Sequence, residues 1–458
     1  MAQKPSIPKG TRDFSPVEVS RREYIIQTIK SHFKNFGFQP IETPSFEKSS
    51  TLLGKYGEEG DRLIFKILNS GDFLKKSNEQ HLQAKDSNAL ASQIAEKALK
   101  YDLTVPFARY VVQHQHELVF PFKRYQVQPV WRADRPQKGR FREFVQCDAD
   151  VIGSDSLWQE VEFVMLYDQV FHALQLNGIT IKLNNRKILS GFAEVIEEQD
   201  KLIDFTVALD KLDKIGEEGV KKEMFEKGIA EEAIAKIQPI FSFSGNFEDK
   251  INQLKNILST SKIGLEGVEE LTFVHQALED YDFKSATLDL DVTLARGLNY
   301  YTGAIFEISA PENVKIGSIG GGGRYDDLTG IFGLKNMSGV GISFGLDRIY
   351  LVLEELNLFP ETVSDSTQIL FINFGFEESK YAMKAIMKLR QKGIKAELYP
   401  DDTKFKKQMQ YADKRGIKYA VIAGESEIEK QAFNLKNLET GEQELVDLET
   451  ILRKFASQ

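Results

Sequence analysis

The segment from Val119 to Gly153 constrains the fold more than any other part of the chain. Side chains at alternate positions share one face of a β-strand, and both arms of this segment alternate between polar and apolar residues. We therefore predict an antiparallel hairpin with one apolar face and one mostly polar face. The polar face carries Arg124, Gln126, Gln128 and Arg132 on the first arm, and Arg142, Gln146, Asp148 and Asp150 on the second.

The residue types on this polar face indicate a binding site. The alternative is an ordinary hairpin whose polar face is merely solvated. Solvated strands favour Lys, Thr and Glu, whereas Arg, Gln and Asp suit bidentate recognition of a ligand. The connection, residues 135–140, holds three cations and no acidic residue, so its charges repel one another unless an anion binds. We predict that the hairpin is the floor of a site that presents Arg132, Gln146 and Asp150.

The same segment carries a resemblance to a known family. Residues 131–144 read Trp-Arg-Ala-Asp-Arg-Pro-Gln-Lys-Gly-Arg-Phe-Arg-Glu-Phe, and residues 146–150 read Gln-Cys-Asp-Ala-Asp. Together they resemble motif 2 of the histidyl-tRNA synthetases, over a long and specific stretch. The resemblance spans almost the whole chain, and it is weakest over residues 75–91, over the insertion described below and near the C-terminus.

Length and charge limit what the chain can be. With 458 residues, 41% of them hydrophobic, it is long enough for two or three compact units. A formal charge of −9 argues against nonspecific coating of nucleic acid, so any RNA contact must be a local basic patch. The single cysteine, Cys147, is predicted to be a small core residue, with a reactive thiol as the alternative. No metal-ligand spacing, transmembrane run or leader is evident, so we expect a soluble cytoplasmic protein.

The N-terminal region predicts a long amphipathic helix followed by a strand. Residues 15–18, Ser-Pro-Val-Glu, form a capping box with proline at the first helical position, and Gly37 is a helix stop. Residues 38–41 are then extended. The helix and strand resemble motif 1, the dimer-forming element of class II synthetases, and residues 8–14 resemble the opening of the family. The resemblance therefore implies a homodimer.

Two segments precede the hairpin. Residues 75–91 are polar and alternate poorly, which predicts a mobile excursion. Asp102 and Thr104 point the same way if their backbone is extended, whereas the alternative is that they cap a helix beginning at Pro106. Residues 98–110 resemble the family segment that holds the α-ammonium group of histidine.

The composition changes between residue 185 and about residue 284. After a predicted helix at 160–176 and a strand at 178–182, this region is rich in Lys and Glu. Helical periods over 221–237 and 247–258 predict a helical insertion that is separate from the sheet. In the family, such an insertion lies between motifs 2 and 3 and is thought to reach toward the acceptor arm of the tRNA. From the residues alone, an RNA role and a solvated helical surface stay equally open.

Three motifs follow the insertion. Residues 296–301, Arg-Gly-Leu-Asn-Tyr-Tyr, resemble the histidine-specific signature of the family. The glycine run at 317–323 lacks the ending of a P-loop, so it is either a flexible turn or a backbone that passes close to a ligand. Residues 338–353 predict a strand entering a helix, with Arg348 in its first turn, where a bound anion would offset a cation that opposes the helix dipole. This segment resembles motif 3, although relatives often have Glu at the position of Asp347.

A linker leads into a C-terminal unit. Strands and helices alternate from residue 369 to residue 455, which predicts a small α/β domain with a mainly parallel sheet. This unit, residues 368–458, carries 16 basic and 14 acidic residues, so it is the part of an acidic chain that most easily meets RNA. A solvated helix face is the alternative reading of its basic patch. The patch comprises Lys404, Lys406, Lys407, Lys414 and Arg415.

The resemblance implies an α+β fold. It consists of the class II antiparallel catalytic sheet with a helical insertion, followed by an α/β anticodon-binding domain. The expected parts are the first half of the catalytic core at 1–184, the insertion at 185–284, the second half of the core at 285–358, the linker at 359–367 and the anticodon-binding domain at 368–458.

The resemblance also implies a reaction, the ATP-dependent attachment of L-histidine to tRNA(His) through a histidyl-adenylate, with release of AMP and diphosphate. ATP is then a substrate, and Mg²⁺ is expected on its outer phosphates, with protein ligands unknown. Neither a membrane nor DNA is expected as a partner. Two rivals stay in view: a regulatory relative that keeps the fold but not the chemistry, and another class II synthetase. The first usually lacks the arginine-rich loop, the signature or the terminal domain, and the second lacks the histidine-specific segment.

Each candidate residue receives a role from its place in these motifs. Arg132 and Arg296 are the expected catalytic residues, and both would also contact histidine. The remaining histidine contacts are Asp102 and Thr104 for the ammonium group, Gln146 for the backbone end, Asp150 and Tyr301 for the two ring nitrogens, and Tyr300 and Tyr325 as walls of the pocket. The expected ATP contacts are Arg132, Arg140, Arg296 and Arg348.

Overall fold

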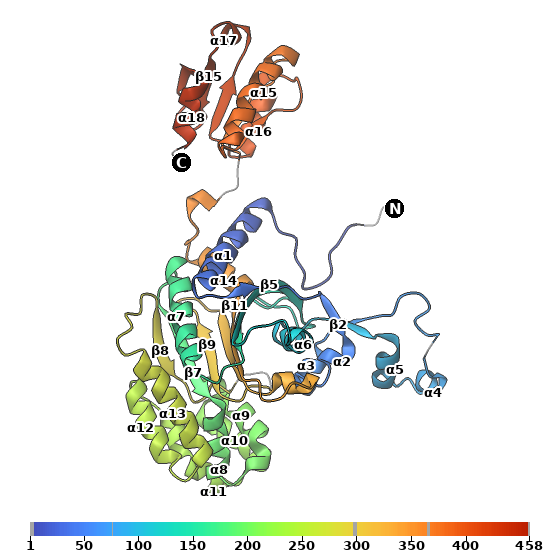
Figure 1. Cartoon of the computed structure of the whole chain (residues 1–458), viewed down its shortest axis with the longest axis vertical. Coiled ribbons are helices and arrows are strands. Elements are labelled where there is room, and N and C mark those ends of the chain that lie inside the picture. The colour runs from blue at the N-terminus through green and yellow to red at the C-terminus, as the bar shows by residue number, and fades with distance from the viewer. Residues whose placement is uncertain (1–3, 76, 296–299, 364–366, 457–458) are drawn as a thin grey trace. The chain divides into compact units, whose positions relative to one another are not determined.

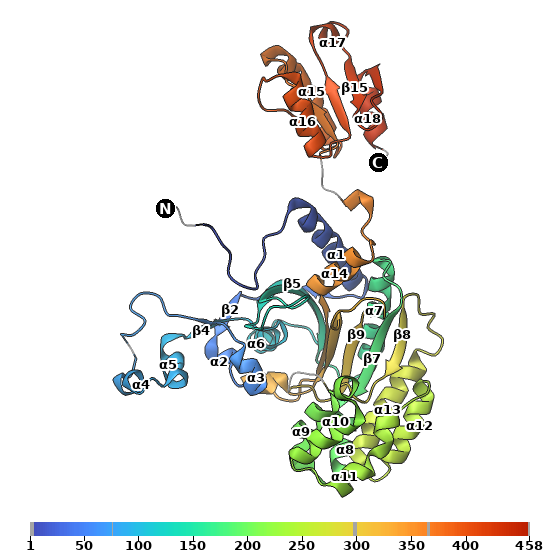
Figure 2. The same ribbon diagram turned by 180° about the vertical axis from the view of Figure 1, so that it is seen from behind.

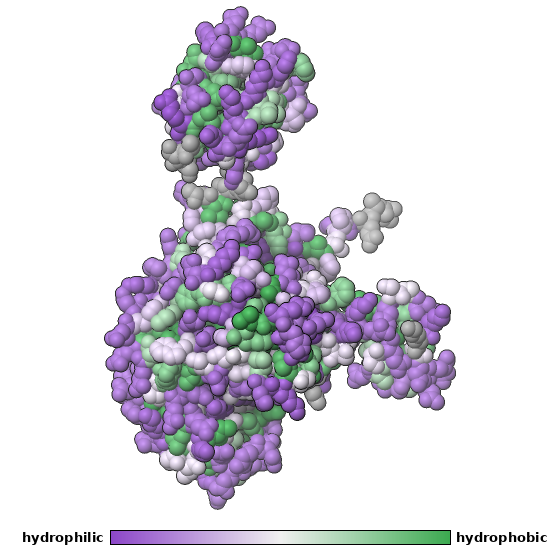
Figure 3. Space-filling view, in the orientation of Figure 1, coloured by the Kyte–Doolittle hydropathy of each residue, from purple (hydrophilic) through white to green (hydrophobic). Residues whose placement is uncertain are grey.

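The computed structural model describes residues 4–75, 77–295, 300–363 and 367–456. It divides into two compact units, Met1–Pro360 and Glu361–Gln458. Hydrophilic residues cover most of the visible face of each unit, with hydrophobic patches between them (Figure 3). None of the described helices combines the length and the hydropathy that a membrane span requires.

Among the described residues, an eight-stranded sheet organises the first unit (Figure 1). Its order is β1-β5-β6-β11-β10-β9-β7-β8. The six inner strands pair antiparallel, and a parallel strand flanks them at each edge, which confirms the expected antiparallel core. The strands are β1 (Gln39–Pro40), β5 (Phe122–Trp131), β6 (Glu143–Ile152), β7 (Ile179–Asn185), β8 (Ala286–Leu290), β9 (Ala304–Ser309), β10 (Gly320–Tyr325) and β11 (Gly339–Gly345).

The predicted hairpin is confirmed as β5 and β6. Arg124 lies opposite Asp150, and Gln126 lies opposite Asp148, so the polar side chains of both arms share one face. That face is not solvated, because each of these four side chains is 2% exposed or less. Burying polar groups is unfavourable unless each finds a partner, so this floor demands partners from the protein or from a ligand.

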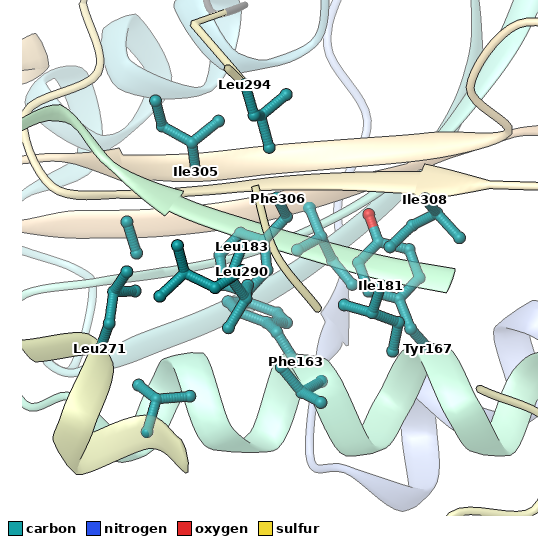
Figure 4. Packing of buried hydrophobic residues seen from close by; sticks show 14 of the residues in the cluster. Phe163, Tyr167, Ile181, Leu183, Leu271, Leu290, Leu294, Ile305, Phe306 and Ile308 are labelled. Atoms are coloured by element: carbon teal, nitrogen blue, oxygen red, sulfur yellow. The ribbon is translucent and has the colours of Figure 1, made fainter. Parts of the chain in front are cut away.

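The apolar face of the hairpin packs on two helices, α1 (Pro16–Asn35) and α7 (Trp158–Ala173). The predicted capping box of α1 is present, and Gly37 follows its end at φ +82°. Phe33 of α1 lies with its ring centroid 5.5 Å from that of Tyr125 on β5. Farther along the sheet, Phe163 and Tyr167 of α7 pack beneath β7, β8 and β9 (Figure 4). Cys147 is fully buried in this layer, as predicted.

The region between β7 and β8 is helical, and its helices gather beside these two strands in both views (Figures 1 and 2). Its buried side chains belong to the same hydrophobic cluster as those of the sheet, and the region lies in the same compact unit. The helical period predicted over 221–237 is divided between two helices, because Gly228 at φ +82° interrupts it. The helices are α8 (Arg186–Val195), α9 (Leu202–Leu209), α10 (Leu212–Glu226), α11 (Glu231–Lys236), α12 (Phe247–Ile257) and α13 (Lys262–Ala277).

Residues 75–91, the segment predicted to be a mobile excursion, are largely helical. Apart from residue 76, which lies outside the described residues, they include α4 (Glu79–Gln83) and most of α5 (Ser87–Ile94). The reason is capping: the side chains of Asn78 and Asp86 accept hydrogen bonds from backbone N–H groups of the first turns. The two helices connect strands of a small sheet with the order β2-β4-β3. Its strands are β2 (Phe46–Lys48), β3 (Lys66–Ile67) and β4 (Lys97–Leu99).

The second unit alternates strands and helices as predicted, around a sheet with the order β13-β12-β14-β15-β16. The mainly parallel sheet is a wrong prediction, because β15 pairs antiparallel with both β14 and β16, while β12 pairs parallel with both β13 and β14. The connections at 423–432 and 438–442 are shorter than the dozen or more residues that a parallel crossover needs. The elements are β12 (Ile369–Phe371), α15 (Phe376–Gln391), β13 (Ala396–Leu398), α16 (Phe405–Lys414), β14 (Tyr419–Ile422), α17 (Glu425–Glu429), β15 (Phe433–Asn437), β16 (Gln443–Val446) and α18 (Leu448–Ala456).

Candidate active site

The polar floor of the hairpin is built around Asp150. Tyr325 donates its hydroxyl hydrogen to one carboxylate oxygen of Asp150 at 2.7 Å, and Nη2 of Arg124 lies 2.7 Å from the other. Arg124 is itself fully buried and lies over the ring of Phe107, 4.3 Å from its centroid. Burial raises the pKa of Asp150, while Arg124 and the Tyr325 hydrogen bond act to lower it. Asp150 is therefore an acceptor whose position is fixed from two sides.

The glycine run forms an inner strand, β10, and not a flexible turn. It pairs with β9 on one side and β11 on the other. A Cβ atom on Gly322 would lie 2.1 Å from the carbonyl oxygen of Gly341, and one on Gly323 would lie 2.7 Å from the ring of Tyr301. A Cβ atom on Gly341 would lie 2.0 Å from Oδ1 of Asp150. Glycine is required here because tyrosine and aspartate side chains of the floor occupy the space beside the backbone.

Three tyrosines stand together beside this floor. The ring centroid of Tyr300 lies 5.0 Å from that of Tyr301 and 6.1 Å from that of Tyr325, in edge-to-face arrangements. Tyr325 is almost fully buried, and the other two are half-buried. Burial raises the pKa of Tyr301, and the nearby Asp150 raises it further, so its hydroxyl stays protonated and can donate a hydrogen bond. The structure thus brings the three predicted tyrosines into one wall.

Asp102 forms a second acidic point of the pocket. It accepts hydrogen bonds from Tyr56 at 2.8 Å, from Tyr300 at 3.1 Å and from the backbone N–H of Val105 at 3.2 Å. Burial raises its pKa, and the Tyr56 hydrogen bond acts in the opposite direction. Helix α6 (Thr104–His114) begins two residues after Asp102, so the backbone at Thr104 is helical and not extended.

The capping alternative therefore applies to Asp102, although the helix begins at Thr104 and not at Pro106. The Thr104 side chain is hydrogen-bonded to Tyr300, so both predicted ammonium contacts lie at the same tyrosine. Tyr56 was missed by sequence reasoning. It lies in a stretch without a motif, and no signal in the sequence indicates that its hydroxyl reaches Asp102.

Arg132 lies where the hairpin leaves the sheet. Its backbone N–H bonds the carbonyl oxygen of Arg142 at 3.0 Å, which places it on the same face as the polar floor. Its Nε atom donates to the carbonyl oxygen of Tyr101 at 3.0 Å, and its guanidinium lies over the Tyr101 ring, 4.2 Å from the centroid. The positive charge of Arg132 acts to lower the pKa of Asp102, so the two groups belong to one electrostatic environment.

The loop between β5 and β6 folds back onto Arg348, in the first turn of α14 (Leu346–Glu355). Arg348 donates to the carbonyl oxygen of Gly139 at 2.8 Å and to that of Ser318 at 2.6 Å, so it is not a merely solvated arginine. Arg140 is 43% exposed, with Nη1 3.6 Å from Asp134.

The expectation of a loop whose cations lack acidic partners is wrong. Asp134 lies beside Arg140, and Lys138 pairs with Glu355 of α14 at 2.9 Å. The sequence concealed both partners, because Asp134 precedes the connection and Glu355 comes from a distant helix.

Asp347, in the first turn of α14, is a buried carboxylate with partners from three parts of the chain. Its carboxylate pairs with Arg12 and Arg22, and it accepts a hydrogen bond from the backbone N–H of Val145 at 3.0 Å. Arg12 also lies over the Phe141 ring, 3.3 Å from its centroid. The N-terminal segment, the loop after β5 and helix α14 are therefore joined at one buried carboxylate.

Several polar atoms of the floor are buried without a hydrogen-bond partner in the described part of the chain. They are Nε and Nη1 of Arg124, Oε1 of Gln126, Oε1 of Gln146, Oδ1 of Asp148 and Oδ2 of Asp150, the oxygen that lies beside Arg124. Leaving such groups unsatisfied costs on the order of 1–3 kcal/mol each. This set on one face is the arrangement expected of a binding site for a polar ligand that supplies the missing partners.

Most predicted site residues therefore meet in one place. Asp102, Thr104, Tyr300, Tyr301, Tyr325 and Asp150 are joined by the contacts above. Gln146 lies on the same floor and donates to the Ser343 hydroxyl at 3.1 Å. Arg140 and Arg348 lie at the loop, and Arg296 lies outside the described residues. Arg124 received no role from the sequence, although its place in the period-two pattern was a usable signal.

Among the described residues, no group of three or more His, Cys, Asp or Glu side chains could hold a metal ion. Asp347, the carboxylate of the motif 3 segment, already forms ion pairs with two arginines and accepts a hydrogen bond from a backbone N–H. The described part of the chain therefore offers no preformed cage for Mg²⁺. The ion usually keeps several waters and binds through one or two carboxylates together with phosphates of the substrate.

Comparisons with known proteins agree with this geometry. A family model described as histidyl-tRNA synthetase matches residues 74–349, and one described as an anticodon binding domain matches residues 368–458. A histidine-tRNA ligase of Christiangramia forsetii is 73% identical to this chain, over 98% of each chain. One of Flavobacterium johnsoniae is 68% identical, again over 98% of each.

A solved structure shows the same fold over the full length. The crystal structure of histidyl-tRNA synthetase from Nostoc sp. PCC 7120 superposes with a TM-score of 0.81 at 32% identity, and the match covers 99% of this chain and 100% of that one. The sequence, the fold and the arrangement of the pocket thus lead to one conclusion. The chain belongs to the histidyl-tRNA synthetase family, whose reaction is the ATP-dependent attachment of L-histidine to tRNA(His).

Proposed function

We propose that the floor of the hairpin binds L-histidine and that the arginines at its open end align ATP for formation of histidyl-adenylate. One observation carries this proposal: a buried polar face with a fixed carboxylate, Asp150, and several polar atoms that have no partner among the described residues. The adenylate then passes its histidyl group to tRNA(His), with release of AMP. The activation step releases diphosphate.

Selection of histidine rests on Asp150 and Tyr301. Asp150 accepts a hydrogen bond from one ring nitrogen, and because Tyr325 and Arg124 fix it in place it also selects one tautomer of the imidazole. The Tyr301 hydroxyl contacts the other nitrogen. An amino acid without these nitrogens would leave buried groups unpaired, which discriminates more strongly than shape alone. Tyr300 and Tyr325 enclose the ring.

The backbone end of histidine lies nearer to Asp102 and Arg132. Asp102 and Thr104 hold the α-ammonium, and Gln146 together with Arg132 positions the carboxylate. Support comes from the shared electrostatic environment of Asp102 and Arg132 and from the common contact of Asp102 and Thr104 with one tyrosine.

Attack of a carboxylate on a phosphate brings like charges together, so the reaction needs cations where negative charge grows. Arg132 and Arg296 act at the α-phosphate. Arg348 and Arg140 contact the outer part of the nucleotide, supported by the contact of Arg348 with the loop that carries Arg140. Mg²⁺, when it arrives with ATP, neutralises charge on the outer phosphates, and no step is assigned to it beyond that.

The C-terminal unit is proposed to contact the anticodon arm. The patch of five exposed cations on and beside α16 supports this role. A second feature was not evident from the sequence: Phe374 and Phe405 are exposed and stack with their ring centroids 6.3 Å apart and their planes at 9°. Exposed aromatic rings beside cations suit the stacking of single-stranded bases.

We further propose a homodimer and a cytoplasmic location. Val17 and Val19 of α1, in the motif 1 region, are about half exposed. Exposed apolar side chains at the start of this helix support an interface. ATP and tRNA, the two substrates besides histidine, are cytoplasmic molecules.

Pyrophosphate exchange tests the proposal. Labelled diphosphate should enter ATP when histidine is supplied and with none of the other nineteen standard amino acids. Asp150→Asn should damage histidine activation far more than ATP binding. Arg296→Ala should lower kcat with only a modest change in the KM values. Absence of exchange from a protein that still binds histidine would favour the regulatory relative.

A further inference from the structure

Asp148 is a buried carboxyl of the floor that has no role so far. It lies two positions from both Gln146 and Asp150, on the same face of β6. Its side chain is 2% exposed, and its Oδ1 atom has no hydrogen-bond partner. Gln126, directly opposite on β5, and Gln146, next along β6, each have an unpartnered Oε1 atom. Three neighbouring side chains therefore present an acceptor, and no described residue donates a hydrogen bond to any of these atoms.

The missing donor must carry several hydrogens and tolerate a carboxylate. An ammonium group has three N–H donors and a positive charge, and it fits three acceptors of which one is acidic. A carboxylate or a phosphate would be repelled by the same set. Of the groups that histidine brings to this floor, only its α-ammonium has this character.

We propose that Asp148 contacts the α-ammonium of histidine from the floor of the pocket, opposite to Asp102, and releases a proton to solvent as this cation enters. The inference deepens the proposed function and rests on it. The proton balance is simple: the empty pocket holds the neutral acid, and the occupied pocket holds the carboxylate paired with the ammonium.

The surroundings of Asp148 agree with a protonated empty state. Burial raises its pKa to about 7, Arg124 on β5 acts to lower it, and Asp150 on the same strand raises it. Ser343 on β11 hydrogen-bonds it, and Asp102 before α6 raises its pKa. Its charge is also felt by the buried ammonium group of Lys100 after β4, by Cys147 on the same strand, by Tyr301 before β9 and by Tyr167 of α7.

Titration calorimetry on the whole protein without ATP tests this inference. Histidine binding is measured at pH 6, 7 and 8, each in two buffers of different ionisation enthalpy, for the unaltered protein and for Asp148→Asn. At pH 7 we expect the unaltered protein to release about half a proton, because a group with a pKa near 7 is about half protonated there. The variant should release almost none.

The dissociation constants give an independent readout. Asparagine resembles the protonated acid, so the ratio of the variant Kd to the unaltered Kd should rise from near 1 at pH 6 to about tenfold at pH 8. Ser343→Ala is the matched control, because it removes a hydrogen bond to Asp148 but keeps the carboxyl, and it should retain the proton release. A merely structural role for Asp148 would instead raise Kd by the same factor at every pH, which would overturn the inference.

A ligand that lacks the ammonium group tests the same contact in the unaltered protein, so the result does not depend on whether a variant folds. Imidazolepropionate keeps the ring and the carboxylate of histidine, so the unaltered protein should release less proton with it at pH 7 than with histidine. Equal release from both ligands refutes the contact. Histidine-dependent exchange by the unaltered protein would then leave the proposed function standing, so the two failures are distinguishable.

Discussion

Gly341→Ala tests whether the fixed position of Asp150 determines histidine recognition. Gly341 lies directly opposite Asp150 on the neighbouring strand β11. The added methyl carbon would lie 2.0 Å from Oδ1 of Asp150, where ordinary contacts begin near 3.4 Å. Because Gly341 belongs to an inner strand held on both sides, the carboxylate must yield, by more than about 1 Å.

The size of the effect follows from the contacts that Asp150 would lose. Tyr325 donates at 2.7 Å and Arg124 lies at 2.7 Å, so a displacement of this size breaks or weakens both. A hydrogen bond to a charged group contributes about 1.5–3 kcal/mol. If recognition of the imidazole depends on the same carboxylate, kcat/KM for histidine should fall about 10- to 150-fold, at 1.36 kcal/mol for each factor of ten. The KM for ATP should stay near its original value.

Exchange of pyrophosphate at varied histidine concentration measures this change, and urea unfolding of the same samples shows whether the variant is folded. Gly345→Ala is the matched control on the same strand, because its methyl group would meet only the carbonyl oxygen of Ile319, at 3.3 Å. An unchanged kcat/KM for histidine in folded Gly341→Ala would refute the reasoning.

Three further predictions concern groups around the pocket. Arg12→Ala removes one of two arginines on Asp347, so the KM for ATP should rise severalfold in exchange kinetics while the KM for histidine stays constant; equal changes in both would contradict this. Glu160→Gln removes the nearer and more buried of two charged partners of Arg324, so urea unfolding should show a loss of about 3–5 kcal/mol in the free energy of unfolding, whereas a loss below about 1 kcal/mol would argue against it. Burial lowers the pKa of Lys100 from 10.5 to about 8, so the unfolded chain binds more protons between these values. The stability of the unaltered protein relative to Lys100→Met should therefore rise from pH 8 to pH 10, and a flat difference would contradict the burial effect.

Local patterns were sufficient for much of the fold. The two-residue alternation of the hairpin, the capping box before α1 and the strand entering α14 all depend on residues close together in sequence, and the structure has each of them. Predictions failed where residues far apart in the sequence determine the local structure. The glycines at 320–323 resemble a turn in the sequence. A glycine run does not reveal which side chains from elsewhere in the chain will pack beside it.

The candidate site shows the same division. Asp102, Asp150 and the three tyrosines could be assigned from motifs, and the structure joins them by hydrogen bonds and ring contacts. The sequence could not show that the polar face is buried from solvent, because exposure depends on which elements cover the strand. For that reason the roles of Arg124 and Asp148 became visible only with the fold.

The pairing of Tyr325 with Asp150 spans 175 positions of sequence. During synthesis the hairpin leaves the ribosome long before the glycine strand that completes its pocket, and contacts of such long range close slowly. Until then its row of arginine, glutamine and aspartate side chains is exposed to water and need not be desolvated. A nascent chain that ends before Tyr325 should therefore not bind histidine. Binding requires that almost the whole of the first unit has been synthesised.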